Sequence, residues 1–347
     1  MIKITFRVHA SHGASSRLLR SLALATGFRE SDPTCTVDFL LSGTESACAA
    51  VRKEGHPCRH LGNGLFPSWN LEATESALGE PAPEMLVVDD SNIDERFLSE
   101  LGEKTFVALM DDHLELEDYP TGAIVNPNIN AHTRTYPAVD SAALLLGTEF
   151  VALSQEFDGY QEFRRENPER ARRIFMSFPG PDTEGSTLAA VRALKSISER
   201  FLAEVAVDDD FSHGEALARE IGLDDRFMVV NGEAGRARRM AAADMAICAP
   251  GIPFYESMLF RLPCVLVFGG EGCVNVAEYA GMNGFAVYLG ESAALDGRAA
   301  KLLQGMLLDK AARDRMSARI SDLVDGLGRF RLADELLGLC AGKGERI

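Results

Sequence analysis

The chain has 347 residues, of which 46% are hydrophobic, and a formal net charge of −17 at pH 7. This length predicts one large or two medium-sized domains, and the apolar content excludes a globally disordered chain. The negative charge argues against a general nucleic-acid or anionic-membrane surface, but it does not exclude a small anion held by local N–H groups.

The N-terminal sequence MIKITFRVHA enters an alternating strand at residues 2–8 and lacks the apolar core and cleavage site of a signal peptide. No later run reaches the uninterrupted length of a membrane span. The seven cysteines include no CxxC pair, so we expect reduced, mostly buried thiols and no zinc site. These features together predict a cytoplasmic protein.

The first half of the chain alternates apolar strands with amphipathic helices. Strands are expected at residues 2–8, 35–41, 57–61, 85–88, 105–110 and 123–125, with helices at 17–26, 45–53 and 94–101 and a loop at 61–70. Parallel strands need such crossover helices, so residues 1–155 predict one doubly wound domain. Two strands end in acidic pairs, Asp89-Asp90 and Asp111-Asp112, which suit a ligand crevice, although helix capping explains Asp90 as well.

The second half repeats this alternation. Residues 144–157 are expected to lead out of the first domain, and the charge-rich segment 158–173 is expected to be a surface helix around a linker at 156–171. Strands follow at residues 174–178, 201–207, 227–230, 245–248, 264–268 and 285–289, and the tail 292–342 is helical. We therefore predict a second doubly wound domain at 172–347, with the last helix packing back on the first domain.

Residues 243–290 contain the strongest functional signal. Two apolar strands in this stretch end in glycine-containing breakers, one at Gly251 and one just before Glu271, and each breaker is followed by a helix. A helix N-terminus behind such a turn offers free N–H groups to a phosphate, at the edge of the sheet where ligands bind. The pattern predicts a nucleotide or diphosphate site, in which Glu256 and Glu271 accept hydrogen bonds from ribose hydroxyls.

The same stretch resembles a known family. It reads A-P-G-I-P-F-Y-E at residues 249–256, R-L-P at 261–263 and E-G-C at 271–273. It is similar to the A-G-G-S-T-T-W-E, G-L-P and E-N-Q pattern of the UDP-sugar hydrolase of pseudaminic-acid biosynthesis, its spore-coat polysaccharide relatives and, more distantly, the lipid II-forming N-acetylglucosaminyltransferase. Gly251, Glu256 and Glu271 match. Ile252, Pro253 and Phe254 replace the family's hydroxyl residues and remove donors for a diphosphate.

Further segments resemble the family in the same order along the chain. FMSFPGPDTEGSTL at residues 175–188 resembles the opening of the family's second domain and assigns Gly180 to the nucleotide site. IVNPNINAHTRTY at residues 124–136 resembles a family loop of N-x-N type and assigns Asn126 and Asn128 to sugar binding, although turn chemistry also favours asparagine there. The resemblance implies a GT-B-like α/β fold, in which two doubly wound Rossmann-type domains face a central cleft.

The first loop departs from the family. Residues 8–25 read V-H-A-S-H-G-A-S-S-R-L-L-R-S-L-A-L-A, and the family's catalytic histidine falls on Arg17. Arginine stays protonated at neutral pH, so it cannot serve as a base, but it can bind a phosphate or a carboxylate. His9 and His12 lie just upstream. We take His12 as the candidate base and Arg17 as an electrostatic clamp; the alternative is that His12 is a solvated loop residue.

The resemblance implies an enzyme of surface-polysaccharide or nonulosonate biosynthesis that cleaves the anomeric C–O bond of a nucleotide-diphosphate sugar, as a hydrolase or a glycosyltransferase. A second interpretation is a catalytically inactive binding or scaffold protein with the same fold, because Arg17 replaces the family's base. We expect no cofactor and no metal, and a nucleotide sugar as the partner.

Overall fold

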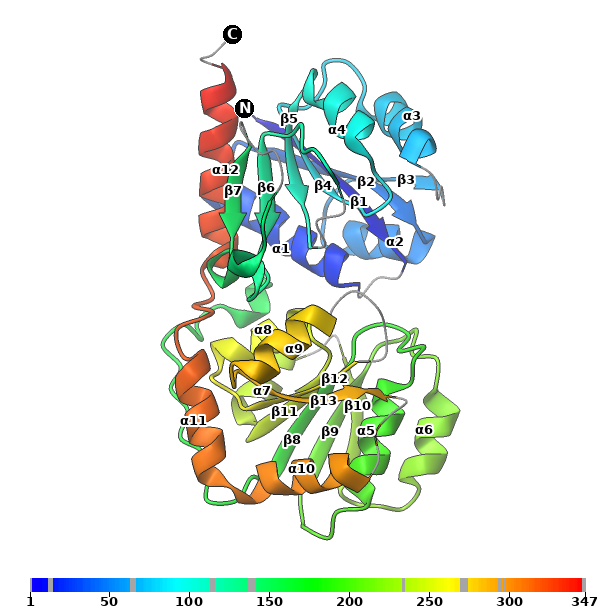
Figure 1. Ribbon diagram of the computed structural model, residues 1–347. Helices are drawn as coiled ribbons and strands as arrows, with labels where there is room; N and C mark the ends of the chain where they lie inside the picture. Colours follow the sequence, from blue (N-terminus) through cyan, green and yellow to red (C-terminus); the bar gives the residue numbers. More distant parts are fainter. Residues whose placement is uncertain are drawn as a thin grey trace. The chain divides into compact units, whose positions relative to one another are not determined.

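The computed structural model describes residues 2–11, 15–62, 67–112, 116–136, 142–232, 235–268, 274–292, 295 and 297–344. The chain divides into two compact units (Figure 1). The first unit consists of Met1–Gln155 and Leu327–Ile347, and the second consists of Glu156–Gly326.

The first unit is built on a parallel sheet. Within the described residues this sheet has seven strands in the order β3-β2-β1-β4-β5-β6-β7. The strands are β1 (Lys3–Ala10), β2 (Thr36–Gly43), β3 (Cys58–Gly62), β4 (Met85–Asp89), β5 (Phe106–Met110), β6 (Ala123–Asn126) and β7 (Ala143–Leu146). The helices are α1 (Ser16–Ser31), α2 (Glu45–Lys53), α3 (Pro67–Leu78), α4 (Glu95–Gly102) and, from the C-terminus, α12 (Gly328–Gly344).

Successive side chains on a strand point to opposite faces of the sheet, and here both faces are apolar. Helices therefore cover both faces of this sheet. On β4, Met85 and Val87 join the apolar core formed with α1, α2 and α12. Leu86 and Val88 of the same strand join the core formed with α3 and α4. Strands buried on both faces read as continuous apolar runs, which is why residues 85–88 were recognisable as a strand from the sequence.

Helix α12 packs against α1, as expected from the sequence (Figure 1). The two helices approach closely at Gly27, where an added Cβ would lie 2.6 Å from the backbone oxygen of Arg329. Arg329 also donates from Nε to Oε2 of Glu30, a residue of α1, at 3.1 Å. The tail from Leu327 therefore belongs to the first unit, whereas the sequence-based domain range 172–347 included it in the second.

The second unit has a parallel sheet of six strands within its described residues, in the order β10-β9-β8-β11-β12-β13. The strands are β8 (Arg173–Ser177), β9 (Leu202–Val207), β10 (Phe227–Asn231), β11 (Met245–Cys248), β12 (Cys264–Phe268) and β13 (Val287–Glu291). The helices are α5 (Ser186–Lys195), α6 (Gly214–Ile221), α7 (Arg236–Ala242), α8 (Ile252–Leu259), α9 (Val274–Met282), α10 (Gly297–Leu308) and α11 (Lys310–Ile320). Short 3-10 turns also occur in the chain. The turns η1 (Ala131–Thr133) and η2 (Thr148–Phe150) belong to the first unit, and η3 (Gln155–Phe157) lies at the boundary between the two units.

Both sheets have the doubly wound strand order that the sequence predicts. In the first, the chain moves outward from β1 to β3 and then returns to β4 on the other side of β1; in the second, β8 and β11 have the same relationship. Ligands of such sheets bind beyond the carboxyl ends of the strands, where the order reverses. The places to search for a site are therefore the ends of β1 and β4 and the ends of β8 and β11.

The prediction of a surface helix at residues 158–173 is wrong. The structure describes this whole segment and shows no helix in it. Arg165 holds it in an irregular path by donating to backbone oxygens at the ends of two helices, namely those of Met240, Ala243 and Phe260. Burial lowers the pKa of Arg165 to about 10. The charge-rich pattern that suggested a solvated helix therefore includes a half-buried anchor.

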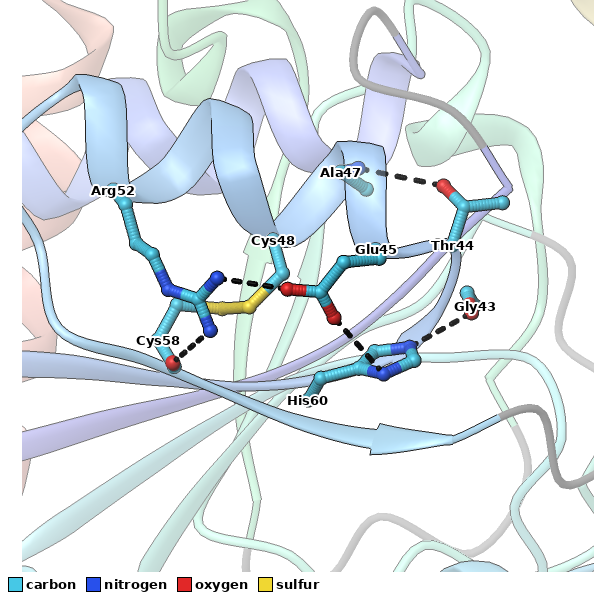
Figure 2. The surroundings of a disulfide bond; sticks show 8 residues. All are labelled: Gly43, Thr44, Glu45, Ala47, Cys48, Arg52, Cys58 and His60. Atoms are coloured by element: carbon cyan, nitrogen blue, oxygen red, sulfur yellow. Dashed lines mark hydrogen bonds and ion pairs between the residues drawn. A yellow bond between two sulfur atoms is a disulfide. The ribbon is translucent and has the colours of Figure 1, made fainter.

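The expectation that all cysteines are reduced is also wrong. Cys48 on α2 and Cys58 on β3 form a disulfide, with their Cα atoms 5.9 Å apart (Figure 2). A polar cluster surrounds it: Arg52 donates to Glu45 at 2.8 Å and to the backbone oxygen of Cys58 at 3.1 Å. The turn from α2 into the neighbouring strand brings together two thiols whose spacing of 10 residues carries no recognisable motif.

Candidate functional site

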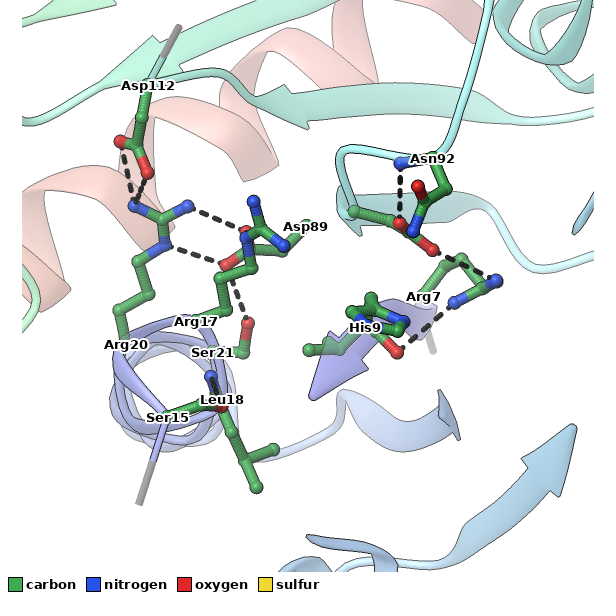
Figure 3. A network of polar contacts seen from close by, with 12 residues as sticks. Arg7, His9, Ser15, Arg17, Leu18, Arg20, Ser21, Asp89, Asn92 and Asp112 are labelled. Atoms are coloured by element: carbon green, nitrogen blue, oxygen red, sulfur yellow. Dashed lines mark hydrogen bonds and ion pairs between the residues drawn. The ribbon is translucent and has the colours of Figure 1, made fainter. Parts of the chain in front are cut away.

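A cluster of ion pairs lies at the carboxyl ends of β4 and β5 in the first unit (Figure 3). Arg20 donates from Nε and Nη2 to the two oxygens of Asp89, both at 2.7 Å, and from Nη1 to Asp112 at 2.7 and 2.9 Å. Burial alone would lower the pKa of Arg20, but the charges of Asp112 and Asp89 outweigh it, so the pKa is raised. Arg20 therefore holds both strand ends in fixed positions.

Arg17 precedes Arg20 by three residues and so lies on the same side of α1. Its Nε is 3.7 Å from Asp89, whose oxygens already accept two shorter bonds from Arg20, and its side chain is 27% exposed. Arg17 also lines a cavity of about 50 Å³, together with Arg20, Asp90, Ser91, Ile93, Leu109, Met110, Asp111, Asp112 and Leu116. This volume holds a few water molecules. Arg17 is consequently a loosely held cation at the edge of a polar hollow.

His9 lies on the other side of this site, at the end of β1 (Figure 3). Its Nδ1 is 3.0 Å from the hydroxyl of Ser42 on β2. The same hydroxyl is 3.0 Å from Nη1 of Arg7 and 3.5 Å from Oδ2 of Asp90. Arg7 and Asp90 are themselves a fully buried ion pair at 3.1 Å. Burial is the main reason that the pKa of His9 is lowered; Asp90 opposes this effect, and Arg17 and Arg7 add to it.

The two asparagines assigned to sugar binding join the same edge of the sheet. Asn128 donates from Nδ2 to Asp112 at 2.9 Å and to Oδ1 of Asn126 at 3.0 Å. Asn126 is buried and donates to the hydroxyl of Tyr136 at 3.1 Å. The chain of contacts from Arg17 through Asp89, Arg20 and Asp112 to Asn128 is continuous, so the structure brings together the predicted first-domain residues that it describes.

Two of the predicted residues lie outside the described residues: His12, in the stretch before α1, and Glu271, in the stretch between β12 and α9. Their assigned roles stay predictions.

In the second unit, the predicted residues lie at the ends of β8 and β11. Gly180 follows β8 with a positive φ of 78°, and its N–H donates to Asp208 at 2.6 Å. Gly251 follows β11 and directly precedes α8, whose carboxylate Glu256 is buried. Glu256 forms an ion pair with Arg236 of α7. Burial raises the pKa of Glu256, and the charge of Arg236 opposes that rise.

The two helix N-termini at this edge differ in what occupies them. Asp182 accepts hydrogen bonds from the N–H groups of Ser186 and Thr187 at 2.9 and 2.8 Å, so a carboxylate already caps α5. The N-cap of α8 is Gly251, which has no side chain to cap the helix. Free N–H groups at a helix start attract anions. At the start of α8, however, Pro253 has no N–H, and the N–H groups of Phe254 and Tyr255 donate to the backbone oxygen of Gly251 at 3.0 and 3.2 Å. Helix α8 therefore lacks a side-chain cap, but most of its first backbone donors are missing or already bonded.

Within the described part of the chain, no group of three or more His, Cys, Asp or Glu side chains is arranged to hold a metal ion. In that same part, no helix combines the length and the apolar character needed to cross a membrane.

Sequence reasoning did not propose Arg7, Arg20 or Ser42 as site residues. The sequence did contain one usable signal, the acidic pairs at the ends of two neighbouring strands. Those carboxylates need cations when they are buried. The partners are Arg20 of α1, 69 residues before Asp89, and Arg7 of β1, 83 residues before Asp90. Only the fold identifies them.

At the level of sequence, the comparison with known proteins does not assign the chain to a family. No protein-family model matches the chain. The uncharacterized protein MJ1062 of Methanocaldococcus jannaschii is 20% identical over 199 residues, which cover 54% of this chain and 41% of that protein. The match thus spans less than half of this relative's length.

Solved structures match nearly the whole chain. MurG of Acinetobacter baumannii gives a TM-score of 0.67 at 13% identity, covering 97% of this chain and 100% of that one. The Staphylococcus aureus MnaA–UDP structure gives 0.67 at 13% identity, covering 98% of each chain. The chain has a GT-B fold. The spinosyn rhamnosyltransferase SpnG is a further match, with a TM-score of 0.62 at 16% identity over 95% of this chain and 99% of that one.

The GT-B fold inferred from motif resemblance is therefore confirmed. At such low identities the likeness concerns the fold alone, and the reaction has to be argued from the site.

Proposed function

We propose that this chain is an enzyme that cleaves the anomeric C–O bond of a nucleotide-diphosphate sugar, as a hydrolase or a glycosyltransferase of surface-polysaccharide or nonulosonate biosynthesis. The observation that carries the proposal is the pairing of a GT-B fold with polar groups at the reversal point of each sheet. One unit supplies a loosely held cation, Arg17, among acids and amides. The other supplies the start of α8, which no side chain caps, with the carboxylate of Glu256.

The second unit would bind the nucleotide. Gly180 and Gly251 would let the ligand approach the backbone, and the N–H of Ile252, the first residue of α8, would bind phosphate. Glu256 and Glu271 would accept from the ribose hydroxyls. Because Glu256 is already paired with Arg236, ribose binding at this position requires the guanidinium to release one carboxylate oxygen.

The first unit would bind the sugar. Asn128, which is half-buried, would contact its hydroxyls, and the buried Asn126 would hold Asn128 in place through its Oδ1. Arg17 would bind a negative group, and His12 would accept the proton of the attacking hydroxyl. A metal is not needed to stabilise a leaving diphosphate, since helix N-termini and guanidinium groups supply positive potential. The partner is a nucleotide sugar, and no other cofactor is included in the scheme.

A second candidate function is a binding or scaffold protein that retains the fold without turnover. Two substitutions favour it: Arg17 replaces the family's histidine, and Ile252-Pro253-Phe254 replace hydroxyl residues in front of Glu256. Both changes remove groups that the resembled hydrolase family carries at these positions.

A ligand panel separates the two candidates. Thermal shift and calorimetry with UDP, CMP, GDP and their sugars measure binding, and release of nucleoside diphosphate measures turnover. Binding with turnover supports the enzyme, and detection of free sugar identifies a hydrolase. Binding without turnover supports the scaffold. No binding across the panel contradicts both. Arg17→Gln tests the site, with Arg96→Gln as a control, because Arg96 is an exposed arginine of α4.

A further inference from the structure

Ser42, His9 and Asp90 lie in one row across the carboxyl edge of the first sheet. The parallel register pairs His9 of β1 with Ser42 of β2. On the other side of β1, Val8 pairs with Asp89, so Asp90 lies one residue further along, beside His9. The row is therefore set by strand pairing and not by a mobile loop, which is how a precise catalytic geometry is best supported.

The hydrogen-bonding capacity of Ser42 determines the direction of the bonds in this row. A serine hydroxyl accepts two hydrogen bonds and donates one. Arg7 has only donors, so its Nη1 uses one acceptor position at 3.0 Å. Asp90, ionised in its buried pair with Arg7, has only acceptors, so it takes the single Ser42 proton at 3.5 Å. The remaining position on Ser42 is an acceptor, and it faces Nδ1 of His9 at 3.0 Å.

This arrangement selects one tautomer of His9. The imidazole carries its proton on Nδ1 and donates it to Ser42, and Nε2 keeps a free lone pair on the opposite side of the ring. No residue in the described part of the chain forms a hydrogen bond with Nε2 that would occupy it. Burial, with the opposing charge of Asp90 and the reinforcing charges of Arg17 and Arg7, lowers the pKa of His9 and keeps the ring neutral at pH 7.

We propose that His9, oriented by the relay from Asp90 through Ser42, is the general base of the reaction in place of His12. This inference rests on the proposed function and names the residue that carries its proton transfer. Ser42 and Asp90 act as positioning residues, in the way that an acid orients a catalytic histidine in hydrolytic enzymes.

In the proposed step, the oxygen of water or of an acceptor hydroxyl bonds to the anomeric carbon as its proton passes to Nε2 of His9. The bond between the anomeric carbon and the phosphate oxygen breaks, and the nucleoside diphosphate leaves with that electron pair. The imidazolium then returns the proton to solvent. No oxidant, reductant or further reactant is required.

The test compares wild-type protein with His9→Gln, His12→Gln and Ser42→Ala, and uses His60→Gln as a matched control, because His60 is another partly buried histidine of the same sheet outside the row. For His9→Gln we expect kcat to fall by about 10²- to 10⁴-fold, the range typical of a lost general base, while UDP affinity is kept. For Ser42→Ala we expect a smaller fall. In the wild type, kcat/KM should fall at acidic pH with a limb that His9→Gln removes.

A second measurement does not depend on turnover. Nitrogen-15 NMR of the imidazole rings, with His9 assigned by its absence in His9→Gln, reports the tautomer at pH 7. We expect protonated Nδ1 and bare Nε2 in the wild type, and a mixture of tautomers in Ser42→Ala.

The outcomes separate this inference from the proposed function. Turnover in the wild type that persists in His9→Gln, or that is lost in His12→Gln alone, overturns the role of His9 and leaves the proposed function standing. A His9 that is protonated on Nε2 at pH 7 also overturns it. Absence of turnover in the wild type overturns the enzymatic proposal itself, and the role of His9 with it.

Discussion

Arg20 and Asp89 meet side-on, with Nε and Nη2 of the arginine each 2.7 Å from one oxygen of the carboxylate. The third nitrogen of Arg20 binds Asp112, so one side chain from α1 ties together the ends of β4 and β5. Asp89 is fully buried and Arg20 nearly so. The pair therefore forms a rigid floor of the candidate site, and Arg17 lies against it with its Nε 3.7 Å from Asp89.

The first prediction concerns the ion pair of Arg20 and Asp89. Arg20→Met leaves the carboxylate of Asp89 buried without its two strongest donors, and removing one partner of a buried pair costs about 3–5 kcal/mol. Urea denaturation should show a loss of that size. Arg96→Met removes one partner of an exposed i,i+4 pair on α4 and should change the unfolding free energy by less than about 1 kcal/mol. Equal losses in the two variants would contradict the assigned role of Arg20.

The second prediction concerns the contact between α1 and α12. In Gly27→Ala the new methyl group would lie 2.6 Å from the backbone oxygen of Arg329, and backbone atoms move less readily than side chains. Forcing an extra carbon into packed structure costs about 1–3 kcal/mol, so the first unit should unfold at lower temperature. The matched control is Gly338→Ala on α12, where a Cβ meets nothing within 4 Å. We expect this control to be neutral or stabilising, because alanine favours helices.

The third prediction concerns pH. The pKa of His9 is lowered from 6.5 in the folded protein, chiefly by burial. The unfolded chain therefore takes up a proton at His9 more readily, and the stabilising contribution of neutral His9 is present above pH 6.5 and is lost as the pH falls below it. Between pH 7.5 and 5.5, wild-type protein should lose more unfolding free energy than His9→Gln. A His9→Gln variant that loses as much as the wild type would contradict this account.

The fourth prediction concerns the ion pair of Glu256 and Arg236. Glu256→Gln leaves a mostly buried guanidinium without its carboxylate and should destabilise the second unit by about 3 kcal/mol. A double-mutant cycle with Arg236→Met should give a coupling energy of about 1–3 kcal/mol. For comparison, the more exposed pair of Arg192 and Glu220 should give less than about 1 kcal/mol. A cycle without coupling would show that the two groups do not interact in solution.

The fifth prediction concerns the disulfide between Cys48 and Cys58. Of the six cysteines within the described residues, two are paired in the disulfide and four are not. Reduction of the denatured protein before thiol titration should therefore raise the number of reactive thiols by two, to the seven that the sequence contains. Closing a loop of 10 residues stabilises a protein by about 3 kcal/mol in the chain-entropy model, so Cys58→Ser should lower the melting temperature. Seven thiols without reductant would show that the bond does not form. Cys340→Ser changes a half-buried cysteine outside the disulfide and serves as the control.

Most of the fold was predictable because it depends on local patterns. Many strands of the two sheets are apolar runs, several of them followed by glycine or an acid, and most are separated by crossover helices. Two elements were missed for physical reasons. Strand β7 has only four residues at the edge of its sheet and lies in a stretch that reads as a connection between domains. Helix α3 begins at Pro67, inside a stretch that we expected to be a loop.

The site was less predictable, because its contacts join distant parts of the chain. Glycine and asparagine positions could be proposed from motifs, and Asn128 does reach the acidic cluster. The partners of buried charges could not be predicted from motifs. Arg7 and Asp90 are separated by 83 residues and meet only because β1 and β4 are neighbouring strands. Sequence spacing carries no record of such a pairing.

Helix α12 contributes Leu332 and Leu336 to the same core as α1 and β1. During synthesis, the ribosome releases these residues only after the whole second unit has been translated. The first unit is therefore begun before the second and completed after it. Its nascent form must keep an apolar face of α1 uncovered until α12 has been synthesised. We expect cotranslational chaperones that bind exposed apolar surface to engage this chain longer than a protein whose domains close in order.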